Sequence, residues 1–359
     1  MRVHNFCAGP CTLPLEVLEE VRDELVDFRG SGMSLIEMSH RSPEYDAVHE
    51  EALSLFRSVF GVPADRTILF LQGGATLQFA LVPINLLGEG QRAAYVRSGT
   101  WGKGALKDAA AWGDAYAAWD GEPVGFTRMP RAHELEIRTD TRYLHVTSNE
   151  TIEGIRMASF PDPGVPLVGD LSSEYVSRPI PWERFDVVYG GAQKNLGPAG
   201  LAVVVVRTDL LERVRTDLPS YLRYDTHAAK DSLMNTPPMF AIYVMGKVLR
   251  WIEGLGGVEA MAERAERRSG AVYDAIETSE GFYRSPVDAA DRSHMNVVFR
   301  TPSDDLDAAF VKEAEGGGLV NLKGHRSVGG IRASIYNAMT DEGVDALVGF
   351  MGTFRDANG

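Results

Sequence analysis

Lys194 stands in a stretch of sequence that could support nucleophilic chemistry. An apolar run ends at Tyr189, and a β-branched run begins after Gly200. We expect Gly190 and Gly191 to end the first strand, so that the lysine lies on a tight turn between two strands, where backbone can approach a ligand closely. Desolvation there would lower the pKa of the amine, whose neutral form could then attack an aldehyde and form a Schiff base.

Other polar and aromatic residues follow further predicted strands. The run 67–72 is followed by Gly73, Gly74, Ala75 and Thr76, and the run 92–96 by Ser98 and Trp101. The run 142–146 is followed by Thr147, Asn149 and Thr151, and the run 165–169 by Asp170. Gln193 and Lys194 follow the run 185–189. Ligands of open α/β sheets bind beyond the carboxyl ends of the strands. The sequence therefore predicts that these residues converge on one cleft.

The chemistry of this cleft suits one cofactor. Segment 74–76 would open a helix, so its free N–H groups and the positive end of the helix dipole suit a phosphate. Trp101 offers a flat face for an aromatic ring, and Asp170 could hold a protonated ring nitrogen. Together with Lys194, these features predict a site for pyridoxal 5'-phosphate, a phosphorylated pyridine aldehyde.

Two loops carry cations that suit an anionic substrate. His40 and Arg41 lie between two predicted helices, and His325, Arg326 and Arg332 lie in a glycine-rich segment near the other end of the sequence. Adjacent His and Arg side chains form a dense anion site, and a guanidinium fork fits a carboxylate. We expect a substrate that carries both a phosphate and a carboxylate.

The elements that must position these residues alternate between strands and helices from residue 67 onward. This rhythm predicts an α/β fold with a large, doubly wound, mainly parallel sheet and a smaller α+β C-terminal domain. Expected helices cover 14–28, 45–61, 75–87, 103–113, 304–318 and 341–354, with a long helix broken at Gly254, Gly256 and Gly257. We expect an N-terminal segment at 1–15, the cofactor-binding domain at 16–256 and the small domain at 257–359.

Composition excludes several classes of partner. The formal charge of −14 and the pI near 5.1 argue against nucleic acid and anionic membranes. Neither a signal peptide nor a membrane-spanning apolar run is apparent. Cys7 and Cys11 have neither redox nor zinc-site spacing, which favours small hydrophobic residues in a reducing cytoplasm and gives no metal site.

At these residues the chain resembles the phosphoserine aminotransferases, a family of class V aminotransferases with the fold type I pyridoxal phosphate architecture. The resemblance covers nearly the whole length. Its motifs are NFCAGPCTLP, EMSHRSPEY, LQGGATLQFA, GTWGKGA, SNETIEGI, GDLSSEYVSRPI, YGGAQKNLGPAGL, NTPPMF and LKGHRSVGGIRASIYNAM.

The resemblance implies a role for each matched position. Lys194 would form the Schiff base, Asp170 would pair with the ring nitrogen, Trp101 would stack on the ring and Thr151 would bond the ring hydroxyl. Gly74, Ala75, Thr76 and Gln193 would bind the cofactor phosphate, Asn235 and Thr236 would reach it from the other subunit of a homodimer with shared sites, and His40, Arg41, His325, Arg326 and Arg332 would bind substrate. Some members of the family have an arginine where this chain has Thr76. Without that positive charge, binding of the substrate phosphate would depend more on the His–Arg pairs.

The implied reaction transfers the amino group of glutamate to 3-phosphohydroxypyruvate and gives O-phosphoserine and 2-oxoglutarate, a step of serine biosynthesis. 3-Hydroxy-2-oxo-4-phosphooxybutanoate, used in pyridoxine biosynthesis, carries the same functional groups and stays open as an acceptor. Alternatives are a serine:pyruvate or alanine:glyoxylate aminotransferase and a non-catalytic phosphometabolite-binding protein. A cysteine desulfurase would need a cysteine well after the lysine, and the chain has none beyond Cys11.

Overall fold

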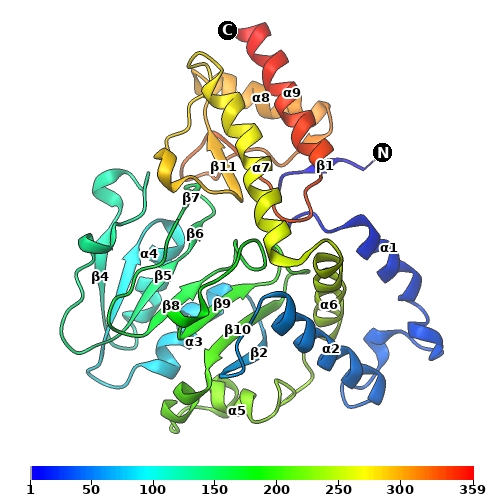
Figure 1. Cartoon of the computed structure of the whole chain (residues 1–359), viewed down its shortest axis with the longest axis vertical. Helices are drawn as coiled ribbons and strands as arrows, with labels where there is room; N and C mark the ends of the chain where they lie inside the picture. Colours follow the sequence, from blue (N-terminus) through cyan, green and yellow to red (C-terminus); the bar gives the residue numbers. More distant parts are fainter. Residues whose placement is uncertain (1) are drawn as a thin grey trace.

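The computed structural model describes residues 2–359, and its largest feature is a seven-stranded sheet (Figure 1). In spatial order the strands are β2 (Arg66–Gln72), β10 (Leu201–Arg207), β9 (Val187–Gly191), β8 (Leu167–Asp170), β5 (Thr141–Thr147), β3 (Arg92–Arg97) and β4 (Asp114–Asp120). Among these strands only β10 runs antiparallel to its neighbours. The expected mainly parallel sheet is confirmed.

Helices cover both faces of this sheet because the strands bury apolar side chains on both sides. Ile68 and Phe70 of β2 point into a core shared with α1 (Leu15–Glu24), α2 (Pro43–Val59) and α6 (Met239–Gly254). Leu69 and Leu71 point into the opposite core, which contains residues of α3 (Ala75–Leu86), α4 (Thr100–Ala109) and α5 (Tyr224–Ala228). The strand ends therefore stay open between two helical layers.

The C-terminal part has its own core around Phe299 and Phe310. It contains α7 (Gly257–Glu277), β11 (Asn296–Phe299), α8 (Asp304–Gly316), β12 (Leu319–Val320), β13 (Ile331–Ser334) and α9 (Asp341–Asn358). Strand β1 (His4–Asn5) pairs with β12, so the N-terminal segment joins this part (Figure 1). The division of the chain at residues 16 and 257 stays a prediction.

Several boundaries differ from those expected. Helix α1 ends at Glu24 instead of residue 28, and α4 begins at Thr100, which puts Trp101 on a helix instead of a loop. Strand β4 escaped prediction because it is an edge strand of seven residues without a long apolar run.

The strand before Lys194 also runs further than expected. β9 continues through Gly190 and Gly191, which pair with β10. A Cβ atom on Gly190 would lie 2.4 Å from the Tyr175 ring. These glycines serve close packing within the sheet, whereas the sequence suggested a break.

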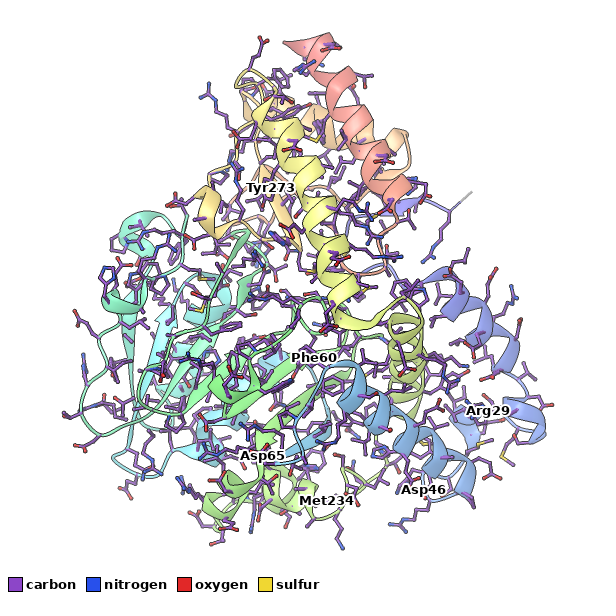
Figure 2. All side chains as sticks on the ribbon, viewed as in Figure 1. Arg29, Asp46, Phe60, Asp65, Met234 and Tyr273 are labelled. Atoms are coloured by element: carbon purple, nitrogen blue, oxygen red, sulfur yellow. The ribbon has the colours of Figure 1, made fainter. Side chains whose placement is uncertain are left out.

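An aromatic cluster supports this end of β9 from behind. Phe60, at the end of α2 (Figure 2), meets the rings of Tyr175 and Trp182 edge to face, with centroids 5.5 and 5.2 Å apart. Tyr175 then packs on Gly190 and donates its hydroxyl to the carbonyl of Val203. Aromatic packing and this hydrogen bond thus hold the end of β9, from which the turn with Lys194 begins.

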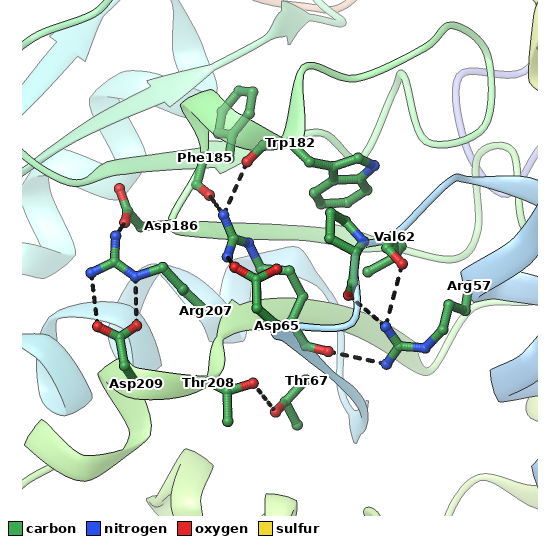
Figure 3. Close-up of polar contacts among 12 residues, drawn as sticks. Arg57, Val62, Asp65, Thr67, Trp182, Phe185, Asp186, Arg207, Thr208 and Asp209 are labelled. Atoms are coloured by element: carbon green, nitrogen blue, oxygen red, sulfur yellow. Dashed lines mark hydrogen bonds and ion pairs between the residues drawn. The ribbon is translucent and has the colours of Figure 1, made fainter.

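Arginines bind neighbouring segments at the N-terminal ends of the parallel strands (Figure 3). Arg66 donates to the carbonyls of Trp182 and Phe185, and Arg207 pairs with Asp186 and Asp209. Arg66 thus joins the start of β2 to the segment that leads into β9, and Arg207 joins the end of β10 to the residue before β9.

Candidate active site

Lys194 lies in a buried turn between β9 and β10. Its Nζ donates to Thr151 Oγ1 at 2.6 Å and to Ser173 Oγ at 2.9 Å, and it lies 5.8 Å from the centroid of the Trp101 indole ring. Three separate segments thus position one amine.

Burial changes the acidity of this amine. Desolvation lowers the pKa of Lys194 to about 8, although the charges of Asp170 and Glu150 raise it in part. A large fraction of the amine is consequently neutral near pH 8, as a nucleophile requires.

Asp170 ends β8 beside the lysine. Its Oδ1 accepts the N–H of Ser172 at 2.9 Å and the Ser172 hydroxyl at 2.6 Å, and that hydroxyl also accepts the N–H of Gly191 at 3.1 Å. Within residues 2–359 no hydrogen bond reaches Oδ2. Burial raises the pKa of Asp170, whereas the charge of Lys194 and the bonds from Ser172 lower it. One carboxylate oxygen is therefore available to a protonated ring nitrogen.

A phosphate-binding geometry lies at the start of α3. Gly73 has a φ of +94° and donates its N–H to the carbonyl of Gly200 at 3.1 Å. Gly74 then caps the helix in an extended conformation, and a Cβ there would meet no atom within 4 Å. The first-turn N–H groups at Ala75 and Thr76 lack intrahelical acceptors, so they could bind an anion.

The structure brings Arg332 close to the lysine cluster, which consists of Lys194, Thr151 and Ser173. Its guanidinium, half-buried on β13, donates to the carbonyl of Thr151 at 3.4 Å. His325 lies in the loop before β13, where its Nδ1 contacts Ser327 Oγ at 2.7 Å, and Arg326 is exposed in the same loop.

A second group of predicted residues lies apart from Lys194. His40 Nδ1 contacts Thr236 Oγ1 at 3.1 Å, and the Thr236 carbonyl accepts from Gln72 at 2.7 Å. Asn235 and Arg41 are exposed. In the described part of the chain, no hydrogen bond or ion pair links these residues to Lys194, Thr151 or Asp170.

Comparison with known proteins decides the family. A family model described as aminotransferase class-V matches residues 3–347. The chain belongs to the class V aminotransferases. It is 50% identical to the phosphoserine aminotransferase of Niallia circulans, with 100% of this chain and 99% of that protein covered, and 49% identical to that of Laribacter hongkongensis, with both chains fully covered.

Solved structures agree with this assignment. A phosphoserine aminotransferase from Bacillus circulans subsp. alkalophilus superposes with a TM-score of 0.98 at 50% identity, over 100% of this chain and 99% of that one. The alanine–glyoxylate aminotransferase of Nostoc sp. has a TM-score of 0.76 at 16% identity, over 99% of this chain and 95% of that one, a likeness of fold alone. Among the described residues of this class V aminotransferase, no helix is long and apolar enough to cross a membrane.

Pyridoxal phosphate fits the residues that this class V aminotransferase presents. The free Asp170 oxygen, the open space at Gly74 and the Trp101 ring beside the lysine match its nitrogen, phosphate and aromatic ring. The indole Nε1 of Trp101 is buried without a hydrogen-bond partner among residues 2–359.

Sequence reasoning missed three residues of this class V aminotransferase that contact the site. Ser172 and Ser173 hold Asp170 and Lys194, and the SS pair directly after GDL was the available signal. Cys11, expected to have no consequence, donates its N–H to the Gln193 carbonyl at 3.0 Å, and its thiol donates to the Lys194 carbonyl. Burial raises the pKa of this thiol to about 12, so it stays protonated.

Proposed function

We propose that this chain is a pyridoxal phosphate-dependent phosphoserine aminotransferase, which moves the amino group of glutamate to 3-phosphohydroxypyruvate. The observation that carries the proposal is a buried Lys194 amine, with a pKa lowered to about 8, held between the Trp101 ring, the Thr151 hydroxyl and the charge of Asp170. Full-length identity of 50% to a phosphoserine aminotransferase supports the same reaction.

The chain's own residues hold the cofactor. When bound, pyridoxal phosphate supplies an aldehyde that receives the amino group and a ring that accepts electrons. Asp170 would keep the ring nitrogen protonated, Trp101 would stack on the ring and Thr151 would bond its hydroxyl. Gln193 and the N–H groups of segment 74–76 would hold the phosphate.

Lys194 is also the base that moves the proton. Its Nζ would take the proton from the α-carbon of the bound amino acid and hold it for the return transfer. The hydroxyls of Thr151 and Ser173 hold Nζ within 2.9 Å and so limit its position during the transfer.

Cations recognise the two anionic ends of each substrate. Arg332 binds the α-carboxylate of both glutamate and the keto acid, because its half-buried guanidinium faces the lysine cluster through Thr151. His40, Arg41, His325 and Arg326 bind either the phosphate or the glutamate side chain. Thr76 adds no charge here, so these four residues carry the selectivity for phosphate.

The site needs a second copy of the chain. No hydrogen bond links His40 or Thr236 to Lys194 among residues 2–359, and the segment that precedes His40 in the sequence exposes large apolar side chains, at Val26, Met33 and Ile36. A homodimer would cover this apolar surface and bring these residues, with Asn235, to the partner's lysine. Both cysteines are free thiols, which suits the cytoplasm.

A coupled assay tests the proposed function. The purified chain, loaded with pyridoxal phosphate and glutamate, is offered 3-phosphohydroxypyruvate, 3-hydroxy-2-oxo-4-phosphooxybutanoate, pyruvate or glyoxylate, and 2-oxoglutarate is measured. We expect turnover with the phosphorylated acceptors and at least about 100-fold lower kcat/KM without phosphate, which corresponds to roughly 3 kcal/mol of lost binding in the transition state. Comparable turnover with glyoxylate or pyruvate would contradict the proposal.

A further inference from the structure

A pair of carboxyl groups lies at the start of α4, outside the predicted site. Glu150, on β6 (Asn149–Glu150), is completely buried. It accepts the Ser98 hydroxyl at 2.8 Å, the N–H of Trp101 at 3.0 Å and the N–H of Gly102 at 2.9 Å. Its carboxylate therefore fixes the helix turn that carries the indole.

Glu153 holds the same turn from the other side. Its Oε1 accepts the N–H of Thr100 at 2.9 Å and the Thr100 hydroxyl at 2.7 Å. Its Oε2 is buried and has no hydrogen-bond partner among residues 2–359. A buried carboxylate oxygen without a partner is costly, and protonation lowers this cost because it removes the charge.

Gly99 shows that the two carboxyl groups are direct neighbours. A Cβ atom at this position would lie 2.7 Å from Glu153 Cδ and Oε2 and 2.8 Å from Glu150 Cδ. Both carboxyl carbons therefore lie within 2.8 Å of one point, and a residue with a side chain could not replace the glycine without moving them.

Two buried carboxyl groups this close cannot both ionise cheaply. Burial and the neighbouring carboxylate raise the pKa of Glu150 to about 8, and burial also raises the pKa of Glu153. Three donors and the helix N-terminus favour the charge on Glu150, which leaves Glu153 Oε2 as the position for the proton. The charged groups that face the pair are Lys194 at Glu150 and His325 and Arg332 at Glu153.

We propose that Glu150 and Glu153 form a proton-sharing pair of positioning residues, in which Glu150 fixes Trp101 over Lys194 and Glu153 controls how much positive charge Arg332 presents to the substrate. This inference rests on the proposed function. While the pair keeps its proton, Glu153 is neutral and the Arg332 guanidinium is fully available to an anionic acceptor. Loss of the proton sets a carboxylate against this guanidinium, which competes with the substrate.

Two glutamine variants separate these roles. Glu153→Gln keeps an acceptor for Thr100 and fixes the neutral form. The KM of the wild type for 3-phosphohydroxypyruvate should rise relative to that of Glu153→Gln between pH 7 and 9, by about 3-fold or more, and kcat should change less than KM. Glu263→Gln, at an exposed position of α7, is the matched control and should follow the wild type.

A measurement on the apo-protein needs neither substrate nor cofactor. The emission of Trp101, isolated by subtracting the spectrum of the Trp101→Phe variant, should change more with pH between 6 and 9 in the wild type than in Glu153→Gln, where Lys194, 5.8 Å from the indole ring, still titrates but the carboxyl pair does not. Glu150→Gln, whose amide cannot accept all three bonds, should shift this emission at every pH.

Pair behaviour and catalytic function can then be judged separately. A Trp101 emission that changes with pH equally in the wild type and Glu153→Gln, or a KM ratio between the two that is constant with pH, would overturn the proposed pair, and both tests hold even if Glu150→Gln fails to fold. A larger pH dependence of the emission in a wild type that does not transaminate would contradict the proposed function alone.

Discussion

Lys194 is buried, and this desolvation explains the low basicity of its amine. Lys194→Ala should reduce turnover by at least about 1,000-fold, because it removes both the nucleophile and the base. The variant should also lose the visible absorption of covalently held cofactor after dialysis. Lys107→Ala, at an exposed position of α4, is the control and should retain both. Normal turnover without Lys194 would refute its assigned role.

The lowered pKa of Lys194 also predicts how the rate of cofactor uptake depends on pH. Its pKa is lowered to about 8, and only the form without the extra proton attacks an aldehyde. The neutral fraction rises from about 1% at pH 6 to about half at pH 8, so the rate of cofactor uptake by the apo-protein should rise about 50-fold over this range. Stopped-flow absorbance measures this rate, and a plateau reached only above pH 10 would indicate a solvated lysine.

At the scale of elements, the end of β9 depends on the absence of a side chain at Gly190. Gly190→Ala would force a methyl group against the Tyr175 ring and should lower the free energy of unfolding by about 1–3 kcal/mol. Gly349→Ala, on the exposed face of α9 with no atom within 4 Å, should instead raise it by up to about 1 kcal/mol. Urea unfolding of the two apo-variants and the wild type measures both changes. A free energy of unfolding of Gly190→Ala equal to that of the wild type would mean that β9 tolerates the methyl group.

The sequence predicted those parts of the site that local patterns specify. Apolar runs located the strands, and the rule for strand ends then selected Asp170, Thr151 and Trp101, which the structure gathers around Lys194. The predicted start of α4 was wrong because the first N–H groups of this helix donate to Glu150 and Glu153, about 50 residues later in the chain. No pattern within the helix itself carries that information.

Close packing between distant segments was equally invisible in the sequence. Gly190 and Gly191 have the composition of a turn, and only the Tyr175 ring explains why they belong to a strand. The contact between His40 and Thr236 likewise joins residues 196 positions apart, which local patterns do not specify.

At the scale of the whole molecule, the proposed homodimer can be tested with two inactive variants. Lys194→Ala removes the proposed nucleophile, and Thr236→Glu would set a carboxylate against the cofactor phosphate in the proposed shared site. If each site combines Lys194 of one chain with Thr236 of the other, a mixed dimer contains one intact site and should regain about half of the wild-type activity per dimer. Co-expression with two different tags isolates the mixed dimer; no recovery would mean that each site is built from a single chain.

The pairing of β1 with β12 has a consequence for biosynthesis. The two partners are separated by more than 300 residues, so at a synthesis rate of roughly 5–20 residues per second β1 emerges tens of seconds before β12 exists. During this interval the segment around His4 has no strand to pair with, and a protease acting on ribosome-bound chains should cut there until β12 has emerged. The C-terminal core is thus completed by one of the earliest segments of the chain to be translated.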